Sequence, residues 1–224
     1  INNKRFKGFV EKTRVEEKLV LGAWFFEEST LFNTIYVPNN NHLYKKTHLV
    51  PFGEYIPFVA SLRGLITFFD LPMSNVEFGP LNQDNLTLIN QYSAATPICF
   101  DIAFPNTVRK MNKSSDFIIN ISNDTWFGSS IGPHHHLNMA RIRAIENNRW
   151  VIRATNDGFS AIISNKGTIV RKLDKGEKSI LEGFIKPINE QSFYNSYGYL
   201  FIIIFSLLFF SLSILYISWF RIKK

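Results

Sequence analysis

Apolar and polar residues alternate in short blocks along most of the chain, and these blocks predict a mixed α/β structure. Short apolar runs between turn-forming residues predict strands, and apolar residues three or four positions apart predict helices. We expect strands at 19–25, 33–37, 96–100, 116–121, 150–155, 160–164, 168–173 and 179–185. We expect helices at 1–18, 102–113 and 134–149. Strands that alternate with helices in this way indicate a layered α/β domain.

Two segments refine this pattern. Asn165-Lys166-Gly167 lies between two predicted strands, and its glycine favours the tight turn of a hairpin. Residues 55–79 are rich in Phe, Leu and Pro but show little periodicity, which predicts a long apolar excursion rather than a core element. An exposed apolar loop needs a partner surface, and a membrane would provide one.

The C-terminal end carries the strongest apolar signal. Residues 200–220 contain no charged residue, and 15 of them are Leu, Ile or Phe. A helix of this length would be about 31 Å long, which is the thickness of a bilayer core. Tyr194, Tyr197 and Tyr199 at one end and Trp219 at the other resemble the aromatic belts of membrane proteins. We therefore predict a transmembrane helix at 199–220.

A basic tail at 221–224 orients this predicted helix. Arg221, Lys223 and Lys224 follow it at once, and the cytoplasmic ends of membrane helices carry such an excess of Lys and Arg. We therefore expect the tail in the cytoplasm and residues 1–198 outside the cytoplasm.

Composition narrows the possible functions. The chain has 224 residues, 46% of them hydrophobic, which suits one large domain. Its net charge is +7, but Lys and Arg are spread without a tract or a zinc-finger spacing, so we expect no nucleic acid as a partner. Three adjacent histidines at 134–136 would point about 100° apart on a helix, so we expect no metal site there.

Cys99 is the single cysteine of the chain, so no disulfide can form within it. A lone cysteine is most often a buried core residue. A second interpretation comes from the stretch 44–55, which contains Lys and His. A thiol attacks as a thiolate, and a nearby ammonium favours that form. Cys99 and this stretch together suggest a nucleophile and its activators.

Five motifs along the chain resemble those of one protein family. They are Tyr44-x-Lys46-x-His48-Leu49-Val50-Pro51-Phe52-Gly53-Glu54, Pro97-Ile98-Cys99-Phe100-Asp101, Ser122-Asn123-Asp124-x-Trp126-Phe127-Gly128, Met139-Ala140-Arg141-x-Arg143-Ala144-x-Glu146 and Arg153-Ala154-Thr155-Asn156-x-Gly158. They are similar to motifs of the carbon-nitrogen hydrolase (nitrilase) superfamily and, within it, of the apolipoprotein N-acyltransferase family. The resemblance implies an α/β fold, a nitrilase-like αββα sandwich over residues 1–192 that lacks its first strand.

The resemblance also implies a reaction and its residues. Cys99 corresponds to the family's nucleophile, Lys46 to its lysine and Glu54 to its second glutamate. Cys99 would take a fatty acyl chain from a phospholipid as a thioester and pass it to the N-terminal diacylglyceryl-cysteine amine of a lipoprotein. Lys46 and the backbone N–H of Phe100 would stabilise the oxyanion. Glu54 would position Lys46 or relay a proton.

Further motif residues would surround this centre. The resemblance implies substrate contacts or a site wall from Phe100, Asp101, Asn123, Asp124, Trp126 and Phe127. Structural pairing is expected from Arg141, Arg143 and Glu146. Neither a cofactor nor a metal is implied. The implied partners are a phospholipid acyl donor, a lipoprotein acceptor and the membrane, with the enzyme in the bacterial inner membrane and its domain on the periplasmic side.

The chain departs from the family pattern in three places. Phe100 and Asp101 stand where the family commonly has Tyr and Glu. The family's general base is a glutamate in a Trp-Pro-Glu-like segment before the first helix, whereas this sequence starts within that helix and lacks the family's N-terminal membrane helices. Glu27 and Glu28 follow a later strand and do not replace that base. We therefore expect the C-terminal part of a longer enzyme, or the product of a broken gene, that is close to inactive alone.

Two other functions remain open from the sequence. A soluble amidase or nitrilase would use the same cysteine, lysine and glutamate chemistry, but it needs no membrane helix. A degenerate scaffold that only binds lipid or protein would explain the missing base, but it would not explain why Cys99, Lys46 and Glu54 are all present.

Overall fold

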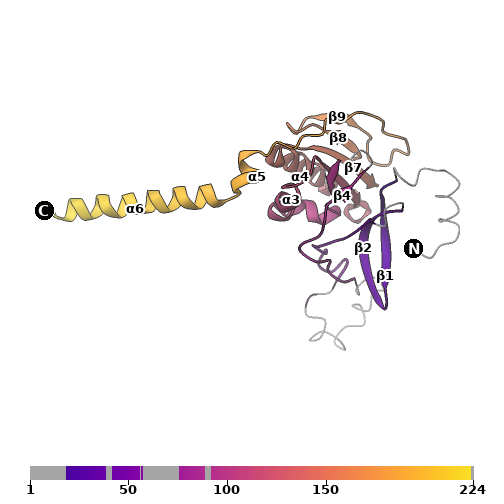
Figure 1. Cartoon of the computed structure of the whole chain (residues 1–224), viewed down its shortest axis with the longest axis horizontal. Helices are drawn as coiled ribbons and strands as arrows, with labels where there is room; N and C mark the ends of the chain where they lie inside the picture. The colour runs from indigo at the N-terminus through magenta and orange to yellow at the C-terminus, as the bar shows by residue number, and fades with distance from the viewer. Residues whose placement is uncertain (1–18, 39–41, 56, 58–75, 89–91, 223–224) are drawn as a thin grey trace.

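The computed structural model describes residues 19–38, 42–55, 57, 76–88 and 92–222 (Figure 1). These residues form two β-sheets, several helices packed on the larger sheet, and one long C-terminal helix. The predicted helix at 1–18 and most of the apolar stretch at 55–79 lie outside the described residues.

Three antiparallel strands form the smaller sheet. They are β1 (Leu21–Glu27), β2 (Thr30–Val37) and β3 (His42–Lys45), in that order. β1 is not the buried strand that its apolar run predicts. Its residues alternate between half-buried and exposed positions, with Trp24 and Phe26 on the exposed face. Strand β3 is absent from the sequence-based prediction.

Six strands form the larger sheet. They are β4 (Leu86–Thr87), β5 (Ser93–Ala95), β6 (Phe117–Asn123), β7 (Trp150–Asn156), β8 (Ala161–Ile163) and β9 (Ile169–Lys172), in that order. β5, β6 and β7 are parallel, and the other neighbours are antiparallel. The predicted β8–β9 hairpin is confirmed, with Gly167 at φ 74° in its turn. The carboxyl ends of β6 and β7 lie side by side, which is where open α/β sheets place ligands.

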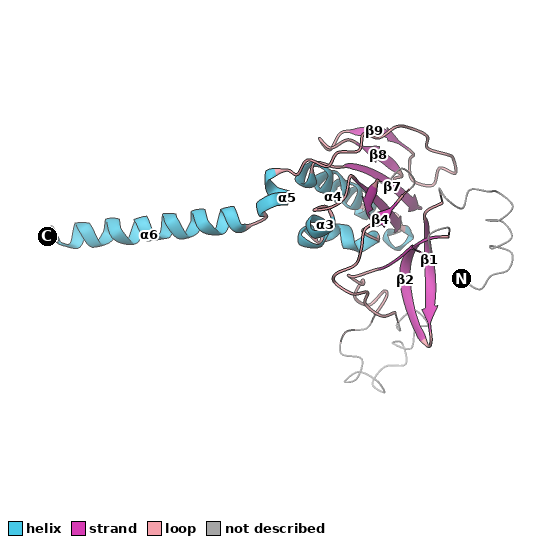
Figure 2. Ribbon diagram, in the orientation of Figure 1, coloured by secondary structure: helices cyan, strands magenta, loops and turns pink. Residues whose placement is uncertain are grey.

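The helices that pack on the domain are short except for one. They are α3 (Pro105–Met111), α4 (Gly132–Asn147) and α5 (Phe193–Tyr197), together with the 3-10 helices η4 (Cys99–Ala103) and η5 (Thr125–Phe127). Figure 2 shows α3 and α4 on one side of the larger sheet and the smaller sheet on the other. The described residues therefore form three layers, of helices, larger sheet and smaller sheet.

Strand β6 is buried on both faces, which explains its nearly continuous apolar run. Ile118 belongs to a core cluster with Leu137 and Ala140 of α4, whereas its neighbour Ile119 belongs to a cluster with Val37 of β2. Full burial of one such aliphatic side chain contributes about 1.5–3 kcal/mol to stability. Both layers are therefore held to the central sheet mainly by apolar packing.

The strand predicted at 96–100 is wrong. β5 ends at Ala95, and Cys99 begins η4 instead. Pro97 has no backbone N–H to donate to a neighbouring strand. The Asp101 carboxylate also accepts a hydrogen bond from the backbone N–H of Ile98 at 3.1 Å, which closes a turn at this point. The helix predicted from 102 starts later, at Pro105, because proline is favoured in the first helical turn.

The strand predicted at 179–185 is also wrong. Its residues pair with no strand of the two described sheets. Ile180 and Phe184, whose apolar side chains favoured a strand, are 83% and 94% exposed. Helix α5, which the sequence pattern does not predict, follows this segment and is capped by the Ser192 side chain, which accepts from the N–H of Asn195 at 2.9 Å.

The C-terminal helix α6 (Leu200–Ile222) leaves the domain as an isolated element (Figure 1). Over Leu200–Trp219 it is long and apolar enough to cross a membrane, and none of that stretch is buried against the described domain. An apolar helix at the C-terminus therefore forms where the hydrophobic pattern predicts it.

Candidate active site

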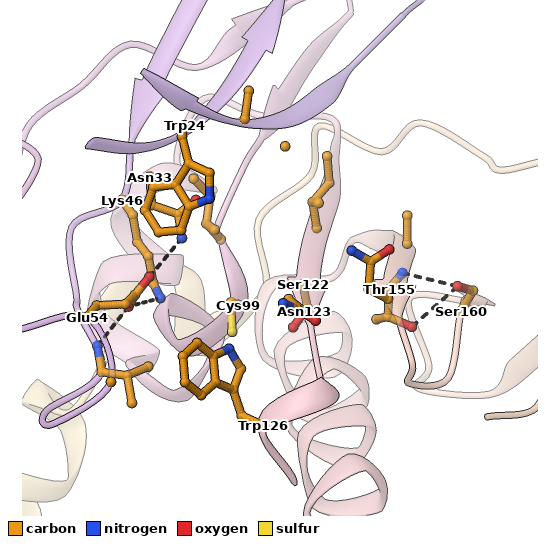
Figure 3. Close-up of a pocket in the computed structure, with 18 residues that line it drawn as sticks. Trp24, Asn33, Lys46, Glu54, Cys99, Ser122, Asn123, Trp126, Thr155 and Ser160 are labelled. Atoms are coloured by element: carbon orange, nitrogen blue, oxygen red, sulfur yellow. Dashed lines mark hydrogen bonds and ion pairs between the residues drawn. The ribbon is translucent and has the colours of Figure 1, made fainter. Parts of the chain in front are cut away.

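A cavity of about 440 Å³ lies between the smaller sheet and the carboxyl ends of β6 and β7 (Figure 3). Its ionisable lining residues are Lys46 and Glu54 from the loop after β3 and Cys99 from η4. The cavity thus brings together the three residues to which the family resemblance assigns the chemistry. Within the described ranges, no three His, Cys, Asp or Glu side chains converge as a metal site requires.

Lys46 and Glu54 form a buried ion pair at one wall of this cavity. Nζ of Lys46 is 2.5 Å from Oε2 of Glu54, and the two side chains are 1% and 7% exposed. Nδ2 of Asn33 donates to Oε1 of Glu54 at 2.8 Å, and the backbone N–H of Val50 donates to Oε2 at 2.8 Å. Both carboxylate oxygens are therefore occupied. Glu54 is suited to fix the Lys46 ammonium in place rather than to act as a mobile base.

Cys99 sits at a tight turn that directs its thiol into the cavity (Figure 3). Its φ is 46°, in the left-handed region, which costs a residue with a Cβ roughly 1–2 kcal/mol. Hydrogen bonds on both sides offset that cost. The N–H of Asp101 donates to the carbonyl of Ile98 at 2.9 Å, and the carbonyl of Cys99 accepts from Nε2 of His136 at 3.0 Å.

Asp101 stabilises this turn through hydrogen bonds, and it does not line the cavity. Its fully buried carboxylate accepts from the N–H of His48 at 2.7 Å and from the Tyr44 hydroxyl at 3.1 Å, in addition to the N–H of Ile98. Burial raises the pKa of Asp101 from 3.8 to about 6, and the hydrogen bonds and the charge of Lys46 only partly oppose this shift. Asp101 therefore links η4 to the loop that carries Lys46.

The raised pKa of Asp101 predicts a pH-dependent stability. Folded Asp101 binds its proton more tightly than unfolded Asp101, so its contribution to the free energy of unfolding is full below about pH 4 and is lost as the pH rises through about 6. A shift of this size corresponds to about 3 kcal/mol. We expect Asp101→Asn to lack this decline. Chemical denaturation of both proteins from pH 4 to 7 tests this, and parallel pH profiles would contradict it.

A buried charge cluster, formed by Asp124, His136 and Arg153, lies beside the backbone of Cys99. Oδ1 of Asp124 is 2.8 Å from Nδ1 of His136, and Oδ2 accepts from Nη2 of Arg153 at 2.8 Å. Burial acts to raise the pKa of Asp124, but the His136 hydrogen bond and the charges of Arg153 and His136 outweigh it, so the pKa lies below its ordinary value. Asp124 is therefore a buried carboxylate that joins β6, β7 and α4.

The structure divides the six residues predicted as substrate contacts or site wall. Asn123 and Trp126 line the cavity, and Trp126 is 60% exposed. The other four are not among the lining residues, and they are Phe100, Asp101, Asp124 and Phe127. The two aspartates are buried among hydrogen-bond donors, as described above. Each phenylalanine ring packs edge-on against another ring, that of Phe104 or His136.

Several cavity residues are not apparent from the sequence. Trp24, Asn33, Thr155 and Ser160 also line the cavity. Asn33 is a polar residue within an apolar strand, which is a usable signal. Thr155 belongs to the last of the five motifs, but the resemblance assigns it no role. The expected pairing of Arg143 with Glu146 forms within α4. The position of His136 at the site cannot be predicted from the spacing of residues in the sequence, because its partners, Asp124 and the Cys99 carbonyl, come from other parts of the fold.

The sequence profile of the family described as carbon-nitrogen hydrolase matches residues 13–190. This chain belongs to the carbon-nitrogen hydrolase family. The resemblance of the five motifs is thereby confirmed, as is the nitrilase-like α/β fold class.

Curated relatives show which members of this family the chain resembles. The chain is 46% identical over 147 residues to an apolipoprotein N-acyltransferase of Pseudomonas syringae pv. tomato, which covers 66% of this chain and 29% of that protein. It is 42% identical over 184 residues to an apolipoprotein N-acyltransferase of Pseudomonas aeruginosa, which covers 82% of this chain and 35% of that protein. The chain therefore spans about a third of the length of these curated relatives.

Among solved structures, the chain is similar to the NitFhit protein of C. elegans. The TM-score is 0.56 at 20% identity, and the match covers 75% of this chain and 43% of that one. At this level of identity the likeness concerns the fold alone. It agrees with the arrangement of sheets and helices described above.

Proposed function

We propose that this chain is the nucleophile-bearing part of a membrane-bound N-acyltransferase that matures lipoproteins. It would transfer a fatty acyl chain from a phospholipid to the N-terminal diacylglyceryl-cysteine amine of a lipoprotein. The observation that carries the proposal is the cavity that holds Cys99 together with the Lys46–Glu54 pair, in a chain similar to curated apolipoprotein N-acyltransferases. Residues 1–192 would form the catalytic domain.

In the first half-reaction, the Cys99 thiolate would attack the ester carbonyl of the phospholipid. A C–S bond forms, the carbonyl electron pair moves to oxygen, and collapse breaks the ester C–O bond so that the lysophospholipid leaves as it gains a proton. Lys46 Nζ hydrogen-bonds to Glu54 alone among the described residues, which leaves its other N–H donors for the oxyanion. The backbone N–H of Phe100 would be the second donor.

In the second half-reaction, the lipoprotein amine would attack the thioester, form an amide and release the Cys99 thiolate. The proton of the thiol, and later that of the amine, needs a base. Glu54 is engaged by three donors, from Lys46, Asn33 and Val50, so we assign proton transfer to a separate base. The family resemblance gives that role to a glutamate upstream of the first helix.

We further propose that α6 spans the bacterial inner membrane, over residues 199–220. Its length, its apolar sequence and its exposure support this placement. The basic tail at 221–224 would lie in the cytoplasm, which places the catalytic domain on the periplasmic side. The domain would then stand beside both substrates, because the acyl donor and the lipidated acceptor are held in the same bilayer.

The test is to trap the acyl-enzyme. The full gene product in isolated membranes is incubated with phosphatidylethanolamine that carries an alkyne on its acyl chain, and the label is followed on a gel. We expect a label that neutral hydroxylamine removes, since this reagent cleaves thioesters. Because Cys99 is the proposed site of the thioester, Cys99→Ala should abolish the labile label.

The second substrate provides the matched control. A synthetic diacylglyceryl-cysteine peptide with a free amine should discharge the label, whereas the same peptide with an acetylated amine should not. Absence of a label together with Cys99-dependent hydrolysis of small amides or nitriles would show a hydrolase instead. Absence of both activities would show a binding scaffold, and either result would overturn the proposal.

A further inference from the structure

The buried charge cluster reaches the candidate nucleophile through one contact. Nε2 of His136 is 3.0 Å from the carbonyl oxygen of Cys99. Asp124 is fully buried, and His136 and Arg153 are 5% and 2% exposed, so water does not screen the cluster. The reaction described above uses none of these three side chains, although they come from three different elements and meet beside Cys99.

His136 lies between two hydrogen-bond acceptors. Nε2 faces the carbonyl of Cys99 and Nδ1 faces Oδ1 of Asp124 at 2.8 Å. A neutral imidazole has a single N–H and cannot donate to both oxygens, whereas an imidazolium can. Nη2 of Arg153 also lies 3.2 Å from Nδ1. If Nδ1 carried no proton, it could accept a hydrogen bond from Arg153, but its lone pair would then also face the closer oxygen of Asp124 and repel it. The geometry therefore favours the imidazolium.

The cluster then carries a net positive charge next to Cys99. His136 and Arg153 contribute two positive charges, and Asp124 contributes one negative charge. Burial lowers the pKa of Arg153, and the negative charges of Asp124 and of a Cys99 thiolate raise it. On the cavity side, by contrast, the Lys46–Glu54 pair is neutral as a whole.

We propose that His136 is a positioning residue for Cys99, which as an imidazolium holds the strained nucleophile turn and brings the net positive charge of the cluster to the thiolate. The proposal rests on the proposed function in that it takes Cys99 as the nucleophile. His136 would not touch substrate. It would act through the Cys99 carbonyl, on the side of the turn that faces away from the cavity.

Other titratable groups lie on elements and loops around Cys99. They are Tyr44 of β3, Lys46, His48 and Glu54 of the following loop, Asp101 of η4, Asp124 after β6 and Arg153 of β7. A useful variant must leave all of these unchanged. His136→Gln does so, because an amide N–H can still donate to the Cys99 carbonyl while the positive charge is removed.

The test measures the alkylation of Cys99 by iodoacetamide as a function of pH, in the full protein in detergent. Because only the thiolate reacts, the midpoint of the rate profile reports the pKa of the thiol. We expect His136→Gln to raise this midpoint by about one unit, which is about tenfold slower alkylation at pH values below both midpoints. At high pH, where every molecule is a thiolate, the two rates should agree within about twofold.

His135→Gln is the matched control, since His135 is the exposed neighbour on the same helix. Its profile should coincide with that of the wild type. An unchanged midpoint for His136→Gln, or a rate that falls equally at all pH values, would overturn the proposal. Such results would mean that His136 has only a structural role.

A second measurement does not depend on a variant that folds. Nitrogen-15 NMR of histidine-labelled wild-type protein should show a proton on both ring nitrogens of His136, as the two acceptors require, and a ring with a single N–H would refute the inference. Alkylation needs no lipid, so the two proposals fail separately. A shifted midpoint without an acyl label would refute the acyltransferase alone, and a label with an unchanged midpoint would refute the role of His136 alone.

Discussion

Lys46→Met should reduce thioester formation at Cys99 by about a thousandfold, which is the largest effect we expect from a substitution in the cavity that keeps the nucleophile. Loss of one preorganised oxyanion donor costs about 10²- to 10³-fold in rate. In addition, the variant leaves Glu54 as a buried carboxylate without its cation, beside a thiol that must itself become negative. The measurement is the initial rate of the hydroxylamine-labile acyl label in isolated membranes.

Lys45→Met provides the matched control. Lys45 precedes Lys46 in the sequence, but its Nζ pairs at 2.6 Å with Glu27, whose side chain is 55% exposed. Such a surface pair contributes only about 0–1 kcal/mol. The control should therefore keep its acyl transfer rate within about twofold of the wild type. If Lys46→Met formed the thioester as fast as this control, Lys46 would not be an oxyanion donor.

Arg149→Met should cause the largest loss of stability, about 3–5 kcal/mol. The buried guanidinium of Arg149 donates to Ser115 O at 2.6 Å, Glu190 O at 2.6 Å and Asn189 O at 3.1 Å. Methionine fills similar space but leaves these buried carbonyls without their donors. For a domain of this size the melting temperature should fall by about 6–20 °C. Differential scanning fluorimetry in detergent measures this shift.

Arg141→Met is the comparison for this prediction. Arg141 also donates to a backbone carbonyl, that of Gly167 at 2.8 Å, but its second bond is to the exposed Asn138 side chain. A loss of about 1 kcal/mol is expected for Arg141→Met. Equal shifts in melting temperature for the two variants would show that the buried carbonyls around Arg149 do not make it more important for stability than Arg141.

The elements that the sequence predicts best are those whose pattern is decided locally. Strand β6 and helix α4 have long, regular patterns, and both form close to their predicted positions. The segment 96–100 is apolar enough for a strand. However, the Asp101 side chain accepts a hydrogen bond from the backbone N–H of Ile98, three residues earlier, and the chain forms a turn instead. The segment 179–185 has a strand-like composition but no neighbouring strand to pair with in the described sheets.

The candidate site shows a similar division. Motifs identify Cys99, Lys46 and Glu54 as candidates, and the structure places all three at one cavity. A motif does not, however, distinguish a carboxylate that faces substrate from one that is buried as a brace. Asp101 and Asp124 are of the second kind because donors from several elements converge on them. That convergence is a property of the tertiary fold, so short sequence patterns do not contain it.

The connection between the domain and its C-terminal helix is short and firmly anchored. Asn195 of α5 is fully buried and bonds to Asn147 at 2.8 Å, while its carbonyl accepts from Arg109 at 2.9 Å. Gly198 and Tyr199 alone separate α5 from α6. We therefore expect the domain and α6 to tilt together as one rigid body. If α6 crosses a bilayer, any tilt by which it adapts to the membrane thickness would also change the angle at which the cavity mouth meets the lipid headgroups.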